Sequence, residues 1–224
     1  MARESFQAEL LALREAVCGL GDRVRRAVDD STRALAAADL QRSHDLVERA
    51  VDVSRIRWAI EERAIVAVAQ QAPVASDLRR LMSYLATLND LARIGDHARG
   101  IGEIGVLMGP ATAPRSLGYL PSMADRALAM LDDCLVALAQ DDLTRARHVL
   151  GADDDLDRLQ ARVYADAFQS MISDRSRIQE QTYVLWAAHN IERVGDRATN
   201  VSESVIFLLT GHREFADAPP FTGS

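Results

Sequence analysis

The feature that most constrains this chain is a motif that occurs once in each half of it. Arg93-Ile94-Gly95-Asp96-x-Ala98 and Arg193-Val194-Gly195-Asp196-x-Ala198 share arginine, an apolar residue, glycine, aspartate and alanine in one order. Asp39-Leu40-x-Arg42 and Asp142-Leu143-x-Arg145 repeat at nearly the same separation. Two matched motifs indicate an internal duplication, so we expect two similar halves that share a core.

The composition favours helices and argues against a nucleic-acid partner. Aromatic residues make up 5% of the chain, and there are 12 glycines and 6 prolines, whereas Ala, Leu, Arg and Glu dominate. Such residues form helices readily. The net charge is −7 and the only tight basic cluster is Arg23, Arg25 and Arg26, so we expect no binding to nucleic acid.

Compartment and redox state follow from the termini, the apolar runs and the cysteines. The first ten residues hold no apolar signal core, and no apolar run is long enough to span a bilayer. Cys18 and Cys134 stand alone without a CxxC pattern. We therefore predict a cytoplasmic protein with two free thiols and no direct membrane insertion.

Apolar spacings of three and four predict six helices. The first spans residues 4–37, the second starts at Asp39 and ends at Pro73, and the third runs from about Ser76 to Leu107. A cluster of Gly and Pro marks a link, and three further helices end near Gly211. We predict an all-α fold of two three-helix up-down-up bundles (residues 1–108 and 122–211), a linker at 109–121 and a flexible tail at 212–224.

One face of the last helix carries five polar groups. His189, Glu192, Asp196, Asn200 and Glu203 are spaced by 3, 4, 4 and 3 residues, which places them on one narrow stripe. Carboxylates one turn apart repel each other unless positive charge lies between them. The stripe therefore predicts a hard cation, an arginine partner or a cluster of hydrogen-bond donors at this face.

A different face of the same helix carries small residues. Gly195 lies there with Ala188, Thr199 and Ser202. Glycine inside a helix costs about 1 kcal/mol relative to alanine. We expect this face to be where another helix approaches closely.

A second acidic pair precedes the stripe. Asp153 and Asp157 lie one turn apart near an inward face of the fifth helix. Two antiparallel helices that each offer such a pair could surround a cation with four carboxylates and Asn200. Taken singly, such a pair is more typical of solvated surface, but two pairs at matching positions of a repeat favour a cation site.

Two stretches of the chain are similar to motifs of a known family. They are Gln71-Ala72-Pro73-Val74-Ala75-Ser76-Asp77-Leu78-Arg79 and Glu192-Arg193-Val194-Gly195-Asp196-Arg197-Ala198-Thr199-Asn200. The first resembles the Q-P-x-A-x-D-L-R segment, and the second the E-R-I-G-D-x-A-x-N motif, of the PhoU family of phosphate-uptake regulators. The similarity runs over residues 5–213 in both halves. It implies two three-helix bundles with metal clusters on repeated E(D)xxxD motifs.

The resemblance also implies a function. Members of the family couple the high-affinity phosphate transporter to a sensor histidine kinase, as negative regulators of phosphate-starvation signalling. We therefore expect a non-enzymatic adaptor whose partners are the transporter ATPase and the kinase. A homodimer stays open as a further assembly.

The second half matches the family motif and the first half departs from it. The matching positions, and so the implied ligands of one Fe, Zn, Mn or Mg ion, are Asp153, Asp157, Glu192, Asp196 and Asn200. In the first half four of the corresponding positions hold Ala50, Ser54, Ala92 and Gly100, and of the first stripe only Asp96 and Glu103 are acidic. We expect one divalent or trivalent metal site, in the second half alone.

Three smaller expectations concern side chains near the motifs. Arg57 is one turn beyond Ser54 and either reaches Asp96 in place of a cation or faces solvent. Trp58 and Trp186 are expected to pack.

Two alternative functions stay open. One is a metal-free helical adaptor with another partner, which the altered first half favours. The other is a ferritin-like di-iron enzyme, which needs Glu-x-x-His on two helices. The residues three positions before the five histidines carry no acid: Gln41, Ile94, Arg145, Trp186 and Leu209. The enzyme is therefore the weaker alternative.

Overall fold

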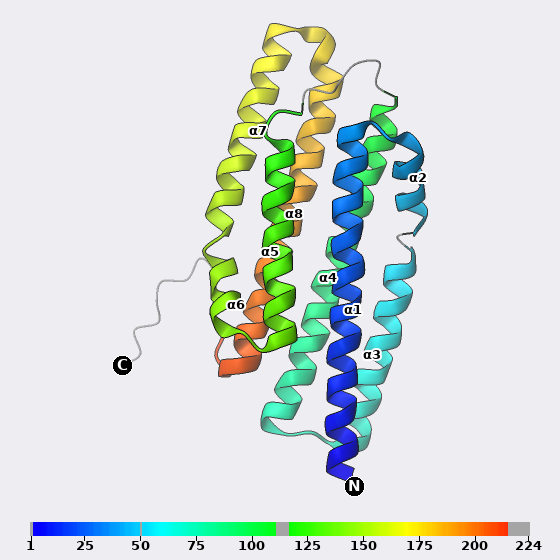
Figure 1. Ribbon diagram of the computed structural model, residues 1–224, viewed down its shortest axis with the longest axis vertical. Coiled ribbons are helices and arrows are strands. Elements are labelled where there is room, and N and C mark those ends of the chain that lie inside the picture. The colour runs from blue at the N-terminus through cyan, green and yellow to red at the C-terminus, as the bar shows by residue number, and fades with distance from the viewer. Residues whose placement is uncertain (1, 50, 111–116, 215–224) are drawn as a thin grey trace, which may run out of the picture.

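The computed structural model describes residues 2–49, 51–110 and 117–214, and all regular structure in these ranges is helical. The helices are α1 (Ala2–Ala37), α2 (Leu40–Arg49), α3 (Val51–Gln71), α4 (Ala75–Met108), α5 (Leu120–Gln140), α6 (Leu143–Leu150), α7 (Asp153–Ser173), the 3-10 turn η1 (Arg175–Arg177) and α8 (Ile178–Thr210). Figure 1 shows them as an elongated bundle with α1 and α5 in front. The expected all-α fold is confirmed.

The six expected helices are present as two up-down-up units, but the middle helix of each unit is interrupted. In the second half α6 ends at Leu150 and α7 begins at Asp153, with Gly151 and Ala152 in a turn. Glycine is a poor helix former, and Asp153, Asp154 and Asp155 complement the positive first turn of the new helix. In the first half the corresponding helices are α2, which ends at Arg49, and α3, which begins at Val51.

One boundary differs from the expectation. Leu120 and Pro121, assigned to the linker, form the first turn of α5, where proline is tolerated because its missing N–H has no intrahelical partner. Residues 111–116 of the linker and 215–224 of the tail lie outside the described part of the chain.

The two matched Asp-Leu-x-Arg motifs are helix N-caps. The Asp39 carboxylate accepts the backbone N–H of Arg42 at 3.0 Å. The Asp142 carboxylate accepts that of Arg145 at 3.0 Å. Each cap satisfies one N–H at the start of α2 or α6.

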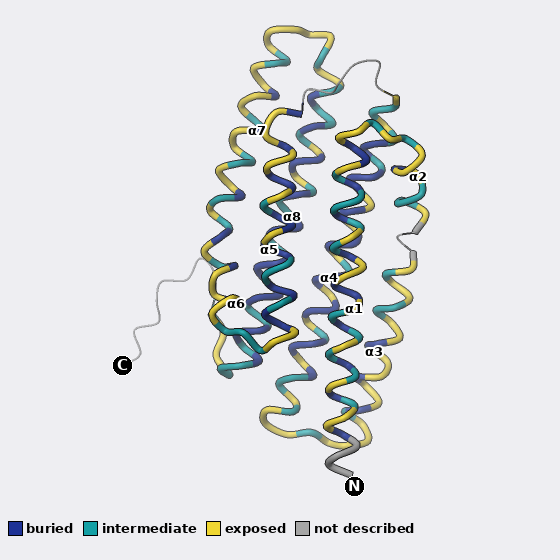
Figure 2. Tube along the Cα trace, viewed as in Figure 1, coloured by how far each residue is buried: buried dark blue, intermediate teal, exposed yellow. Residues whose placement is uncertain are grey.

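The halves share one core. α4 and α8 pack against each other more extensively than any other two helices, while α1 contacts both α4 and α5. α2 and α3 flank one side of this centre and α6 and α7 the other (Figure 1). Buried residues follow the inward faces of the helices (Figure 2) and join in one cluster that includes Leu13, Leu88, Ile101, Leu131 and Ile191.

The small-residue face of α8 is a close-approach surface, as expected. Ala188, Thr199 and Ser202 are all buried. A Cβ on Gly195 would overlap the side chain of Leu156 from α7. Gly195 is therefore needed for α7 and α8 to pack at this distance.

Three side-chain expectations have clear outcomes. Trp58 is 68% exposed and Trp186 is 51% exposed, so the expectation that both pack is wrong. Arg57 pairs with Glu61 at 3.4 Å, one turn along α3, and its interaction with Asp96 is not formed. Cys18 is half-buried and Cys134 is buried, and both are free thiols as expected.

No helix in the described residues is long and apolar enough to cross a membrane.

Candidate metal centre in the second half

Four of the predicted ligands come from adjacent stretches of two helices, where α7 begins beside the middle of α8. Glu192 and Asp196 project from α8, while Asp153 and Asp157 lie in the first turns of α7. Burial raises the pKa of the Glu192 carboxyl, and the charge of Asp196 raises it further. Arg193 opposes both effects, and Asp157 and Asp153 add to them. The four carboxylates therefore give the site an excess of negative charge. The Glu192 side chain, which feels this charge, is only 13% exposed.

Arg193 supplies positive charge within the stripe. Its Nε lies 3.0 Å from Glu192 Oε2, and its Nη1 lies 2.9 Å from Asp196 Oδ2. His189 Nδ1 is farther away, 3.7 Å from the same Glu192 oxygen. Of the three ways to neutralise the stripe, an arginine partner is the one that the structure contains.

Asn200, the fifth predicted ligand, has another partner. Its side-chain amide donates to Asp90 Oδ1 at 3.4 Å, and Arg197 Nη1 lies 3.3 Å from the same oxygen. Asp90 belongs to α4, so Asn200 contributes to the contact between α4 and α8. The sequence signal for this contact is Asp90 itself, an acid beside the apolar residues Leu88 and Leu91. Asp90 is outside the repeated motif, so the motif did not predict its role.

The contact has a counterpart related by the duplication. His97 Nδ1 lies 3.1 Å from Asn190 Oδ1, and His97 and Asn190 occupy the positions that match Arg197 and Asp90. Burial lowers the pKa of His97, and the hydrogen bond to Asn190 opposes that effect. A Cβ on Gly100, which matches Asn200, would lie 2.9 Å from Asn190 Oδ1. Two matching polar contacts thus join α4 to α8, one at Asp90 and one at His97. The hydrogen bond to Asn190 explains the position of His97 without a metal.

The carboxylates suit a hard cation in chemistry but do not form a closed site. Glu192 Oε2 is buried without a hydrogen bond, which is the kind of oxygen that a cation would satisfy. Among the described residues, however, no group of three or more His, Cys, Asp or Glu side chains is close enough to hold a metal ion. A cation at this position must displace Arg193 and draw the aspartates of α7 inward.

The corresponding face of the first half resembles a metal site less than the second half does. Asp96 is 57% exposed in its side chain, and its ion pair with Arg93 is 4.0 Å long. Glu103 pairs with Arg99 at 2.7 Å. Ser54 is exposed, and Ala50 lies outside the described residues. The acids that survive in the first half have arginine partners on their own helix.

Comparison with known proteins decides the family. A model of the PhoU domain matches residues 17–105 and again residues 120–205. The chain belongs to the PhoU domain family. The two PhoU matches coincide with the two halves and leave the linker between them. Each half of the duplication thus matches the PhoU domain.

Individual relatives and a solved structure of the PhoU family are similar to this chain along nearly its whole length. The phosphate-specific transport system accessory protein PhoU homolog of Rhizobium meliloti is 29% identical, and the alignment covers 96% of this chain and 91% of that protein. The homolog of Pseudomonas putida is 31% identical over 93% of this chain and 82% of its own. The crystal structure of PhoU from Pseudomonas aeruginosa superposes with a TM-score of 0.87 at 28% identity, covering 92% of this chain and all (100%) of that one.

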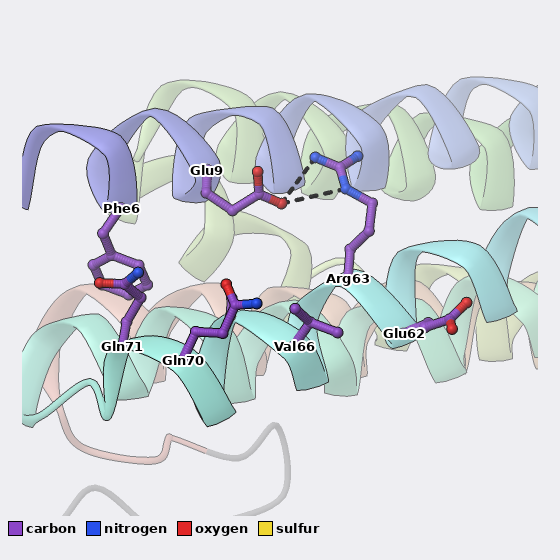
Figure 3. A pocket seen from close by; sticks show the side chains of 8 residues that line it. Phe6, Glu9, Glu62, Arg63, Val66, Gln70 and Gln71 are labelled. Carbon is purple, nitrogen blue, oxygen red and sulfur yellow. Dashed lines mark hydrogen bonds and ion pairs between the residues drawn. The ribbon is translucent and has the colours of Figure 1, made fainter. Parts of the chain in front are cut away.

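A groove elsewhere on the surface is a weaker candidate. It lies between the start of α1 and the end of α3, measures about 420 Å³ and is lined by Phe6, Glu9, Arg63 and Gln70, among others (Figure 3). Arg63 Nη2 donates to Glu9 Oε1 at 3.0 Å, so its two central charges neutralise each other. The other charged residue of the lining is the exposed Glu62, so the groove offers a ligand one further acid and no cluster of like charges.

Proposed function

We propose that this protein is an accessory protein of a phosphate-specific transport system and regulates phosphate uptake. The observation that carries the proposal is that both halves match the PhoU domain. Relatives aligned along nearly the whole chain are named accessory proteins of that transport system. Neither name describes an enzyme, so a regulatory role is the reading that the family supports.

The finer proposal is an adaptor that contacts the transporter's ATPase and a sensor histidine kinase. Large apolar side chains project from the α3–α4 turn and from the α7–α8 turn, which lie at opposite ends of the bundle (Figure 1). Val74 is 75% exposed at one end and Ile172 is 78% exposed at the other. Exposed apolar groups mark sites of protein contact, and two separate ends can hold two partners at once.

We further propose that a divalent or trivalent cation binds at Glu192, Asp196, Asp153 and Asp157 in competition with Arg193. The raised pKa of Glu192 supports the proposal, and so does its buried Oε2, which is in ion-pair contact with Arg193 but accepts no hydrogen bond. A bound cation would relieve both. Binding would link α7 to α8 through their carboxylates. Metal occupancy and the geometry of the exposed α7–α8 turn would then be coupled.

Metal analysis of the purified protein tests the cation. Glu192→Ala with Asp196→Ala should abolish bound Fe, Zn, Mn or Mg, whereas Asp96→Ala in the first half should leave it unchanged. Arg193→Met should strengthen binding because the competing charge is removed. At a hundredfold excess over its dissociation constant the metal should add about 2.7 kcal/mol of stability, which a chelator removes.

The opposite outcomes identify the metal-free adaptor. If Arg193→Met gains no metal and a chelator leaves the melting temperature unchanged, the arginine is the permanent partner of the stripe. Equal metal loss in Asp96→Ala and in the double variant would place the metal elsewhere. Either result removes the cation and leaves the family assignment intact.

Gene deletion tests the regulatory role. Deleting the gene should raise expression of phosphate-starvation genes in phosphate-replete cells, and replacing Glu192 and Asp196 should do the same if the cation matters. If the deletion changes neither that expression nor phosphate uptake, and no transporter or kinase component co-purifies, the regulator proposal fails.

A further inference from the structure

A cavity lies beside Gly95 in the first half. It lies between α1, the α2–α3 pair and α4, measures about 240 Å³, and has an apolar floor that includes Leu46, Val53 and Ile56. Gly95, the glycine of the repeated motif, lies on its wall. The proposed cation site is in the other half of the molecule, so the two features are independent.

The matching space in the second half is filled by larger side chains. Met130 occupies the position of Ala27, and Leu156 occupies the position of Val53. Both reach Gly195: a Cβ there would overlap Leu156 and lie 3.7 Å from the Met130 methyl. On Gly95 a Cβ would meet only Val53, at 3.1 Å. The same backbone therefore forms a packed core in one half and a cavity in the other.

The mouth of the cavity carries unpaired positive charge. Arg23 and Arg26 both line it, and neither forms a hydrogen bond or an ion pair with any residue that the structure describes. Arg99 also lines it and pairs with Glu103 at 2.7 Å. In the second half the match of Arg23 is Arg126, which is bound to Asp155 at 2.6 Å, and the match of Arg26 is Ala129. Free guanidinium groups at this cavity are thus specific to the first half.

The two acids at the cavity have different roles. Asp30 forms an ion pair with Arg42 and is neutralised within the protein. Asp52 has no partner among the described residues and can accept an N–H or O–H from a ligand. A ligand that satisfies all these groups has an anionic end, an apolar or ring-shaped part, and a hydrogen-bond donor.

We propose that this cavity binds an organic phosphate of the nucleotide class. The phosphate groups lie at Arg23 and Arg26, whose planar guanidinium groups match phosphate oxygens. The ring lies on the floor formed by Leu46, Val53 and Ile56, and Asp52 accepts from a sugar hydroxyl or a ring amino group. A pocket with an apolar lining and a few polar groups at its mouth is typical of small-molecule sites.

Calorimetric titration of the full chain with ADP tests the site. Arg23→Gln with Arg26→Gln should weaken binding roughly tenfold or more, since hydrogen bonds to charged groups are removed. Arg55→Gln is the matched control, because Arg55 is exposed on α3 and does not line the cavity. Ala27→Met with Val53→Leu copies the second half and should abolish ADP binding without lowering the melting temperature.

Pyrophosphate and adenosine separate the two parts of the site. Each should bind more weakly than ADP, because each satisfies only the arginines or only the floor. No saturation up to about 1 mM ADP would overturn the proposal, as would equal weakening by Arg55→Gln. Unchanged ADP binding in the filled variant, or pyrophosphate binding as tight as that of ADP, would show a surface charge effect and overturn it as well. None of these outcomes depends on the regulatory role or on the cation.

Discussion

The two halves of the molecule share a fold and differ in what they enclose. Around Gly195 the second half is packed with Met130 and Leu156, and the carboxylates of α7 and α8 gather beside it. Around Gly95 the first half leaves a cavity with free arginines. Smaller side chains at two core positions and the loss of acids on one face account for the difference. A duplicated backbone can thus hold a packed acidic site in one copy and a basic cavity in the other.

The largest expected effect is on the packed half. Leu156→Ala removes a fully buried side chain and should lower the free energy of unfolding by about 2–5 kcal/mol. Val53→Ala, at the matching position beside the cavity, removes half-buried methyl groups and should cost about 1 kcal/mol. Urea unfolding of both variants measures the difference. Equal losses would mean that the first half is as tightly packed as the second.

The next effect separates the two motif glycines. Gly195→Ala places a methyl group on Leu156, and overpacking of a core costs about 1–3 kcal/mol, which exceeds the gain of about 1 kcal/mol in helix propensity. Gly95→Ala presses only on Val53, which can move into the cavity, so this variant should be neutral or more stable. Thermal unfolding of the two variants should give shifts of opposite sign or clearly unequal size. A larger loss from Gly95→Ala would contradict the cavity.

The helix caps should show where the halves are alike. Asp39→Ala and Asp142→Ala each remove one side-chain acceptor at the same 3.0 Å distance. Each should cost about 1 kcal/mol, and the two values should agree within error. Chemical denaturation provides the measurement. A loss confined to one variant would show that the halves differ in backbone support as well as in side-chain packing.

The smallest effect concerns the polar pairs between α4 and α8. Burial raises the pKa of Asp90 above its ordinary value of 3.8, against hydrogen bonds from Asn200 and Arg197. The native state therefore holds this proton more tightly than the unfolded state, and the stability that Asp90 contributes falls as pH rises through the window between the two values. Its counterpart is Asn190, which cannot titrate.

Unfolding free energies measured from about pH 4 to pH 6 test this sign. Wild type should lose stability relative to Asp90→Asn as pH rises, and Asp96→Asn on the exposed face serves as the control. Parallel curves for wild type and Asp90→Asn would show that Asp90 titrates alike in the folded and unfolded chain.

Much of the fold could be predicted because its signals are local. The spacing of Phe6, Leu10, Leu13 and Val17 defines one face of α1, and all four are buried. The caps at Asp39 and Asp142 depend on residues three positions apart, and Gly211 ends α8 in a left-handed conformation. The interruption at Gly151 was missed because the apolar spacing continues across it.

The sequence predicted which residues belong to the candidate site, but only part of the contacts that they make. Glu192, Asp196, Asp153 and Asp157 share a region because helical spacing and antiparallel packing place them there. The role of Arg193 depends on its rotamer, and that of Asn200 depends on Asp90, a residue on another helix. Spacing along one helix contains no information on either choice.

The sequence by itself determined the duplication, the helical class and the acidic stripe, because periodicity and motif order are properties of the chain alone. Only the tertiary structure decided that Arg193 pairs with the carboxylates of the stripe, why Gly95 and Gly195 are not equivalent, and that Trp58 and Trp186 are exposed. Those outcomes depend on side chains brought together from different helices. Val53 on α3 borders a cavity, whereas Leu156 on α7 fills the matching space. The size of each space is set by the neighbouring helices, and it exists only once the helices have packed.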